Sequence, residues 1–414
     1  MQVKRMFAAV QTRTVKAVVS ALLTLIFTLS SFAATVSTRH ESRSNRKIKE
    51  SANTEKRMAA SRHSRAVTSR AGRRGRAAVV AVSRGRAHYY GERFTASSFA
   101  SDPEAGDNSA GEDPVVREAA ISALGNMNGT VVAIDPSNGR ILAMVNQKLA
   151  LSSGAQPCST IKVSVALAAL SEGIVTKDTP VNLGGWKMDM NQALAHSNNQ
   201  YFEALGRRLG FQKVSYYAHQ FGLGELAGWN IEGEHLGVYP SEELPASLGG
   251  VGKMCSFGES VSMTPLQLGS LMAAIANGGT LYYLQHPQSA AQVTNFQPKV
   301  KRYLDIAPLI PEVSVGMLGA TQFGTARSLR TNFTSEQVLG KTGTCSSAGT
   351  RFGWFGSFAN SRNGRIVVVI FLHGDRAVYG PKAAELAGHF YRSLDEHNYF
   401  AGKAAPVRSA ALLK

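Results

Sequence analysis

Apolar, β-rich runs lie at both ends of the globular part of this chain, with a helical region between them. The first two runs, within residues 130–145, flank the turn cluster PSNG at 136–139 and predict a β-hairpin. After about residue 330 the strand pattern returns, and residues 360–364 predict a second hairpin turn. The order favours an α+β (α/β) sandwich, in which one antiparallel sheet is flanked by helices and accompanied by an all-helical subdomain.

Start and stop signals divide the helical region between these runs. A helix is expected over residues 159–171, and Glu-Gly at 172–173 ends it. A break at 197–199 separates two further helices, and Thr264 is a predicted N-cap. A last helix, over about 381–394, is expected to cover the sheet.

The formal charge of +17 is distributed unevenly over the 414 residues. Residues 1–38 carry +4, and residues 39–93 hold sixteen Lys or Arg against four Asp or Glu. Only +1 remains for residues 94–414. The globular part is therefore nearly neutral, and the basic character belongs to the N-terminal quarter.

The first residues have the pattern of a targeting segment. Basic residues precede an apolar run over 17–34, which ends in small residues. This order predicts that residues 1–34 are a secretory signal peptide, although the length also suits an N-terminal membrane anchor. The following segment is more basic than the preceding one, which opposes the positive-inside rule for an anchor. Either interpretation exports the domain.

Residues 35–112 are predicted to be a basic disordered linker, because they are rich in Arg, Ser, Ala and Gly and have few large apolar residues. The simplest role is a solvated spacer. A second is adhesion of residues 39–93 to an anionic membrane or wall polymer. Nucleic acid is not expected as a partner, because only Tyr89 and Tyr90 interleave the basic residues.

The stretch STIK places Ser159 and Lys162 one helical turn apart, on the same side of the expected helix. A lysine in that position can activate a serine hydroxyl. Alternatively, Ser159 or Thr160 caps the helix and Lys162 extends to solvent. The same spacing recurs at 44–47 within the basic tract, so spacing alone is not specific.

Two further polar motifs follow in order along the chain. Ser197 and Asn199 lie in the helix break, 38 residues beyond Ser159. Lys-Thr-Gly-Thr at 341–344 lies in the first strand of the C-terminal sheet, 144 residues beyond Ser197. Each motif alone is weak. The three in this order, each on a suitable element, indicate a serine acyl-transfer site.

With these motifs the chain resembles the transpeptidase domain of penicillin-binding proteins over about residues 131–394. The stretches VVAIDPSNGRILAM and GTARSLRTNFTSEQVLGKTGT are also similar to segments of that family. Two positions depart from its pattern. Cys158 replaces the glycine before the nucleophile, and Gly-Glu-Ser at 258–260 replaces Gly-Gln-Gly. The resemblance implies a β-lactamase/transpeptidase-like fold.

The resemblance also implies catalytic roles. Ser159 would be the nucleophile and Lys162 its base, with a pKa lowered by burial and by the charge of Lys341. Ser197 and Lys341 would pass a proton to the leaving amine. The substrate would be a peptidoglycan stem peptide ending in D-Ala-D-Ala, and β-lactam antibiotics would acylate the same serine. No cofactor or metal is expected.

Substrate-binding roles follow from the same resemblance. Asn199 would hydrogen-bond the amide side chain of the substrate, and Thr342 and Thr344 would bind its terminal carboxylate. The strand edge around Gly343 would align the substrate backbone by β-addition. The backbone N–H groups of Ser159 and Thr344 would form the oxyanion hole.

The three cysteines are Cys158, Cys255 and Cys345. Two of them adjoin the implied oxyanion donors, Ser159 and Thr344, and would therefore lie within disulfide reach. Class A carbapenem-hydrolysing β-lactamases carry a disulfide at these positions relative to their motifs. We expect a Cys158–Cys345 disulfide, with two reduced buried thiols as the alternative and Cys255 unpaired. No Cys/His pair has metal-ligand spacing.

The favoured function is a D,D-transpeptidase or carboxypeptidase of wall synthesis. A serine β-lactamase would need a base for its deacylating water. No Glu-x-x-Leu-Asn segment follows the second motif, and Glu232 and Glu234 are too generic for that role. A non-catalytic β-lactam sensor is the third hypothesis, and the intact motifs oppose it.

The expected organisation follows from these assignments. Residues 113–398 would form the transpeptidase domain, and residues 399–414 a flexible tail. The protein would be exported, either periplasmic or anchored in the inner membrane and facing the cell wall.

Overall fold

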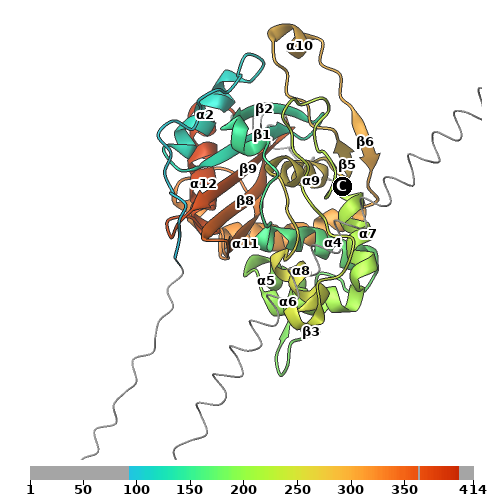
Figure 1. Cartoon of the computed structure of the whole chain (residues 1–414). Helices are drawn as coiled ribbons and strands as arrows, with labels where there is room; N and C mark the ends of the chain where they lie inside the picture. The colour runs from blue at the N-terminus through green and yellow to red at the C-terminus, as the bar shows by residue number, and fades with distance from the viewer. Residues whose placement is uncertain (1–92, 362–363, 401–414) are drawn as a thin grey trace, which may run out of the picture. The chain divides into compact units, whose positions relative to one another are not determined.

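The computed structural model describes residues 93–361 and 364–400 (Figure 1). The first elements in chain order are α2 (Pro114–Leu124), β1 (Gly129–Asp135), β2 (Arg140–Val145), α3 (Gln147–Ala150), η1 (Cys158–Ile161), α4 (Lys162–Ser171), β3 (Val181–Asn182), β4 (Lys187–Met188), α5 (Met190–Ala195), α6 (Asn199–Leu209), α7 (Phe211–Gln220) and η2 (Ala246–Leu248). The rest are α8 (Gly250–Phe257), α9 (Pro265–Asn277), β5 (Thr280–Tyr282), α10 (Ala290–Thr294), β6 (Val300–Tyr303), η3 (Ala307–Leu309), α11 (Ile310–Gln322), η4 (Arg327–Thr331), β7 (Val338–Ser347), β8 (Thr350–Ser361), β9 (Gly364–Gly374) and α12 (Gly380–Glu396).

The central sheet has five strands in the order β2-β1-β9-β8-β7, and every neighbouring pair is antiparallel. The β1–β2 hairpin therefore joins the C-terminal strands through β9, where Val132 is opposite Val369. This arrangement confirms the predicted sheet built from both ends of the domain. Among the described strands, it leaves β7 at one edge of the sheet, beside β8.

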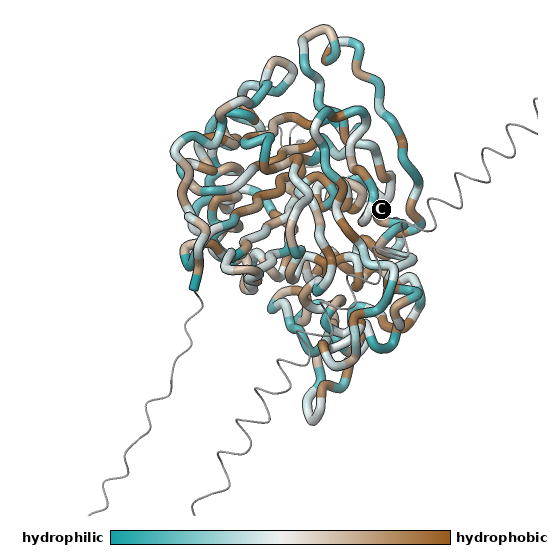
Figure 2. Tube along the Cα trace, viewed as in Figure 1, coloured by the Kyte–Doolittle hydropathy of each residue, from teal (hydrophilic) through white to brown (hydrophobic). Residues whose placement is uncertain are grey.

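Alternation along the strands gives the sheet two buried faces. Val131 and Ala133 of β1 pack into one apolar cluster with α2 and α12. Val132 and Ile134 pack into the other, with α9. Figure 1 shows α2 and α12 together on one side of the sheet and α9 on the other. The hydrophobic segments of Figure 2 concentrate in these layers, in agreement with a core on both faces.

The helical subdomain is organised around α4. Nine consecutive residues of this helix, 162–170, are buried, so it is enclosed on all sides. It contacts α6, α7 and α8, which lie around it (Figure 1). Its enclosed position fixes the residue at its first turn, Lys162, inside the protein. The α9 helix is equally enclosed and begins with a capping box between Thr264 and Gln267.

The folded domain is longer than the sequence predicted. Residues 93–112, assigned to the disordered linker, pack on the domain: Thr95 N donates to Gly349 O at 2.9 Å, and Ser98 Oγ donates to Asp375 Oδ1 at 2.6 Å. Phe400, assigned to the flexible tail, is only 7% exposed. The expected boundaries at 113 and 398 are therefore wrong, and the domain includes residues 93–400.

The predicted export segment at 1–34 and the linker up to residue 92 lie outside the described residues. Within 93–361 and 364–400, no helix combines the length and the apolar character needed to cross a membrane.

Candidate active site

The predicted nucleophile lies on a tight turn at the start of the buried helix. Cys158 has a left-handed backbone (φ 52°), and the 3-10 turn η1 carries Ser159 directly into α4. Ser159 is 9% exposed and lies one turn before Lys162. The serine side chain does not cap the helix. Its hydroxyl accepts a hydrogen bond from Lys162 Nζ at 2.9 Å.

Lys162 is fully buried, which excludes the alternative in which it extends to solvent. Besides contacting the Ser159 hydroxyl, Lys162 Nζ donates to Ser197 O at 2.7 Å and to Asn199 Oδ1 at 2.6 Å. Ser197 Oγ is also within reach, at 3.2 Å. A buried amino group needs hydrogen-bond partners, and the second motif provides them.

The sequence Ser-Asn-Asn shapes the break between α5 and α6. Ser197 has a left-handed backbone (φ 55°), which turns the chain between the two helices. Asn198 caps α6, because its Oδ1 accepts from Tyr201 N at 2.9 Å. This frees Asn199, the first residue of α6, to reach Lys162. The motif therefore provides a cap and a site residue from neighbouring asparagines.

The edge strand β7 supplies the third motif. Lys341 is fully buried and donates to Ser197 Oγ at 2.8 Å and to Thr342 O at 2.9 Å. A continuous chain of hydrogen bonds thus joins Ser159, Lys162, Ser197 and Lys341. Gly343 allows β7 to approach η1, because a Cβ there would lie 2.8 Å from Pro157 O.

Burial determines the electrostatics of the two lysines. Burial, together with the smaller effect of the charge of Lys341, lowers the pKa of Lys162 to about 6, whereas Glu203 opposes the shift. Burial also lowers the pKa of Lys341 to about 7. Near neutral pH, Lys162 is therefore able to accept a proton from the neighbouring Ser159 hydroxyl.

Cys158 and Cys345 form a disulfide, with their Cα atoms 5.6 Å apart. The bond joins the residue before Ser159 to the residue after Thr344. Cys255 is free and buried. Beside the disulfide, Trp354 Nε1 of β8 donates to Gln156 O at 3.0 Å. The nucleophile turn is therefore held against the sheet by one covalent bond and one hydrogen bond.

The hydrogen-bond partners of the two β7 threonines, Thr342 and Thr344, were missed by the sequence analysis. Thr325, before η4, shares a 2.6 Å hydrogen bond with Thr342. Thr344 Oγ1 accepts from Gly380 N, at the start of α12, at 2.7 Å. Thr325 lies in the stretch GTARSLRTNFTSEQVLGKTGT, but no spacing rule marked it. In the described part of the chain, no group of three or more His, Cys, Asp or Glu residues is arranged to hold a metal ion.

Comparison with known proteins agrees with this geometry. Residues 129–392 match the family model of the penicillin binding protein transpeptidase domain. The chain is 25% identical to peptidoglycan D,D-transpeptidase MrdA of Acinetobacter baumannii, over 69% of this chain and 53% of that protein. It is 28% identical to stage V sporulation protein D of Bacillus subtilis, over 51% of this chain and 39% of that protein. The chain thus spans about half or less of these two relatives.

Among solved structures, Pseudomonas aeruginosa PBP2 in complex with WCK 5153 matches with a TM-score of 0.61 and 25% identity, over 72% of this chain and 78% of that one. The D,D-transpeptidase domain of a peptidoglycan glycosyltransferase from Eggerthella lenta has the same fold, with a TM-score of 0.55 and 20% identity, over 69% of this chain and 82% of that one. Family model, fold and motif order agree, and the chain belongs to the penicillin-binding protein transpeptidase family.

Proposed function

We propose that this protein is a peptidoglycan D,D-transpeptidase that is acylated at Ser159 by stem peptides ending in D-Ala-D-Ala. The observation that carries the proposal is the hydrogen-bonded chain from Ser159 through Lys162 and Ser197 to Lys341. The names of the relatives, among them D,D-transpeptidases, support the same activity.

The acylation step follows from this chain of groups. Lys162 accepts the hydroxyl proton while Ser159 Oγ attacks the carbonyl of the penultimate D-Ala. The C–N bond to the terminal D-Ala then breaks, and a proton delivered through Ser197 and Lys341 neutralises the leaving amine. An acyl ester on Ser159 and free D-Ala are the products. The amine of a second strand attacks the ester, forms a new amide and restores the serine.

Substrate binding is assigned to the residues around these hydrogen-bonded catalytic groups. Asn199 hydrogen-bonds the stem peptide, and Thr342 and Thr344 bind the terminal carboxylate. The 5.6 Å Cα separation of Cys158 and Cys345 supports an oxyanion hole between the adjoining N–H groups of Ser159 and Thr344. The free edge of β7 suits pairing with an extended peptide along Gly343.

Export belongs to the same proposal. Residues 1–34 direct the domain across the membrane, as a cleaved signal peptide or an anchor, so that it faces the cell wall. Residues 39–93 serve as a spacer that also attracts an anionic membrane or wall polymer, since they carry twelve net positive charges.

The second candidate function is a serine β-lactamase, which the Cys158–Cys345 disulfide favours through the resemblance to carbapenem-hydrolysing enzymes. Against it, no carboxylate of the described residues hydrogen-bonds Ser159 or Lys162, so a base for the deacylating water is not evident. Hydrolysis of the acyl ester would then be slow.

A fluorescent penicillin tests the proposal on the full chain. We expect a label that persists for hours, is absent in Ser159→Ala, and remains in Ser164→Ala. The control serine lies in α4, directly after η1, but its hydroxyl donates to Ile161 O at 2.8 Å. Label that disappears within seconds while penicillin is consumed would establish the β-lactamase instead. No label on the wild type would refute Ser159 as the nucleophile.

A further inference from the structure

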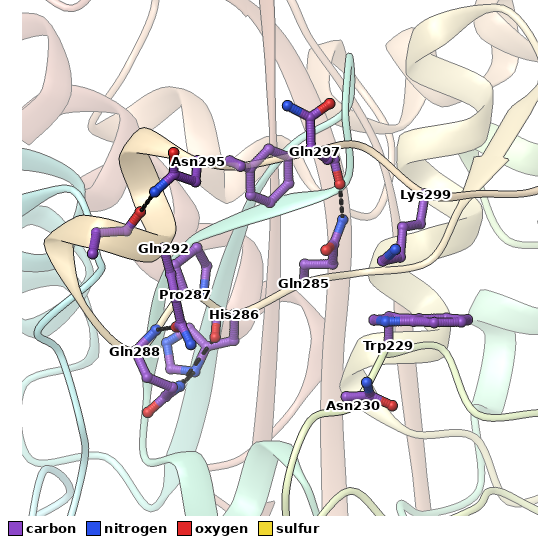
Figure 3. Close-up of a pocket in the computed structure, with 12 residues that line it drawn as sticks. Trp229, Asn230, Gln285, His286, Pro287, Gln288, Gln292, Asn295, Gln297 and Lys299 are labelled. Atoms are coloured by element: carbon purple, nitrogen blue, oxygen red, sulfur yellow. Dashed lines mark hydrogen bonds between the residues drawn. The ribbon is translucent and has the colours of Figure 1, made fainter.

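A second pocket, of about 530 Å³, is built from elements that do not contribute to the Ser159 site. One wall is the loop that carries Trp229 and Asn230, and the other is the excursion from Gln285 to Lys299 that contains α10 (Figure 3). In Figure 1 this excursion extends away from the sheet between β5 and β6. Its lining has a distinctive chemistry.

Amide side chains dominate the lining of the second pocket. Six of its twelve lining residues are Asn or Gln: Asn230, Gln285, Gln288, Gln292, Asn295 and Gln297. None of the twelve is Asp or Glu, and Lys299 is the only Lys or Arg. A metal cation would need carboxylates, and a phosphate would favour several cationic groups. Amides both donate and accept, so they match ligands whose own groups do both, such as hydroxyls and N-acyl groups.

Several of these amides are already held in position. Gln285 Nε2 donates to Gln297 O at 2.9 Å, and Gln288 Nε2 is 2.7 Å from His286 Nδ1, as the dashed lines of Figure 3 show. Gln292 Oε1 accepts from Gln288 N. These bonds leave Gln285 Oε1 and Gln292 Nε2 available to a ligand. Amides that are oriented before binding lose little side-chain entropy when a ligand arrives.

Trp229 adds an exposed aromatic surface to the amides. Trp229 is 41% exposed. Its backbone is nevertheless held in place, because Trp229 N donates to Leu284 O at 2.8 Å. Its ring packs edge-on against Tyr283 at 5.2 Å, and Lys299 Nζ lies 4.7 Å from its centre. Figure 3 shows Lys299 over one face of the ring and Asn230 on the other side. The lysine stem is flexible, so that face can be uncovered.

A ligand that fits both features must have an apolar face and a rim of hydroxyl or amide groups. A pyranose ring has this form: its C–H groups pack on an aromatic ring while its hydroxyls point sideways. We propose that the pocket binds a saccharide, and specifically a segment of N-acetylated glycan strand. The saccharide class follows from the lining alone, whereas the choice of an N-acetylated glycan rests on the proposed function.

The two sites share a connecting segment. The loop that begins at Trp229 continues to His235, whose N donates to Leu151 O at 2.8 Å, and then to Val238, which bridges Ser262. Next to Ser262, Met263 pairs with Ala155, four residues before Ser159. The loop that carries Trp229 is therefore joined by backbone pairing to the segment that leads into the nucleophile turn.

The experiment measures binding of chitotetraose, a β-1,4-linked N-acetylglucosamine oligomer, to the full chain by titration calorimetry. We expect Trp229→Ala to weaken binding about tenfold. Trp186→Ala is the matched control, because Trp186 is also 41% exposed but lies between β3 and β4. Its binding should equal that of the wild type. Gln292→Ala, on the exposed α10 helix, should also weaken binding.

Two results would overturn the saccharide site: no binding of chitotetraose to the wild type, or equal affinities in Trp229→Ala and Trp186→Ala. Penicillin labelling of Ser159 should remain unchanged in all three variants, which verifies that they are folded. This readout separates the two proposals. If the wild type is labelled but does not bind chitotetraose, only the saccharide site is refuted. If the wild type is not labelled, the role of Ser159 as nucleophile is refuted.

Discussion

Two residues beside the buried amino group of Lys162 have backbone conformations that residues other than glycine rarely adopt. Cys158 has φ 52° and Ser197 has φ 55°. Each such residue costs of order 1–3 kcal/mol and persists only where surrounding contacts enforce it. Here the disulfide holds Cys158, and hydrogen bonds from Lys162 and Lys341 hold Ser197. Strain on both sides of one polar cluster is typical of a site maintained for function.

The lowered pKa of Lys162 predicts how penicillin acylation depends on pH. Only the neutral amine accepts the Ser159 proton, so the rate should fall as the pH decreases through about 6. Below that value it should fall about tenfold per pH unit. Stopped-flow acylation of the full chain between pH 5 and 8 measures this limb. A rate that is constant over this range would contradict the role of Lys162 as base.

Lys341 provides a second test of this pH profile, because its charge contributes to the lowered pKa of Lys162. Replacing it in Lys341→Gln removes that repulsion, so the midpoint should move to higher pH, whatever the variant does to the maximal rate. Lys382→Gln, a partly exposed lysine of α12 that pairs with Glu385, should leave the midpoint unchanged.

At the level of secondary structure, the site depends on the contact between η1 and the edge strand β7. Gly343 permits the approach, and the Cys158–Cys345 disulfide closes a loop of 187 residues. We expect the double variant Cys158→Ser/Cys345→Ser to lower the free energy of unfolding by about 2–4 kcal/mol. Its acylation should also slow, because Ser159 and Thr344 are no longer held together.

Chemical denaturation with and without reductant measures the effect of this disulfide. The wild type should lose stability when reduced, and Cys255→Ala, which keeps the disulfide, should behave like the wild type. The double variant should not respond to reductant. An equal response in all three proteins would show that the disulfide does not hold η1 to β7.

Local signals made some elements predictable and left others hidden. The β1–β2 hairpin, the break before α6 and the α9 cap each have a turn or cap residue in the sequence, and all were confirmed. The helices α8 and α11 were missed because glycines lower their helix propensity. In α11, Gly316 lies where a Cβ would be 2.6 Å from Leu194 Cβ of α5. Close packing between helices favours glycine there, and sequence propensity cannot report it.

The candidate site shows the same division between local and distant signals. Motif order identified the residues that the structure joins by hydrogen bonds, because their chemistry requires particular residue types. The partner of Thr342, Thr325, follows a helix that the sequence did not reveal. The fold, not the motif, brings these two threonines together. The second pocket was missed for the same reason, because its amides have no fixed spacing.

At the scale of the whole molecule, the segment 93–112 packs on the rest of the domain. Removing this segment should therefore destabilise the domain. Arg117 of α2 pairs with Glu104 at 3.2 Å, Asp107 at 3.1 Å and Glu112 at 2.9 Å. The Asp107 carboxylate also accepts from the backbone N–H of Asn146 and Gln147, at 2.9 and 2.8 Å. Removing the segment leaves a largely buried guanidinium with none of its three carboxylates.

A chain that begins at residue 113 should therefore be less stable than one that begins at 93, by roughly 3 kcal/mol or more. It also loses Glu112, which contacts buried His286 at 2.8 Å, so the wall of the second pocket should loosen. Thermal unfolding of residues 93–400 and 113–400 measures the difference. Asp107→Asn in the longer chain is the control, and it should lower the melting temperature by a smaller amount. Equal melting temperatures for the two chains would mean that the segment contributes no stability to the domain. A lower melting temperature for the shorter chain would place the start of the folded transpeptidase domain at or before residue 93.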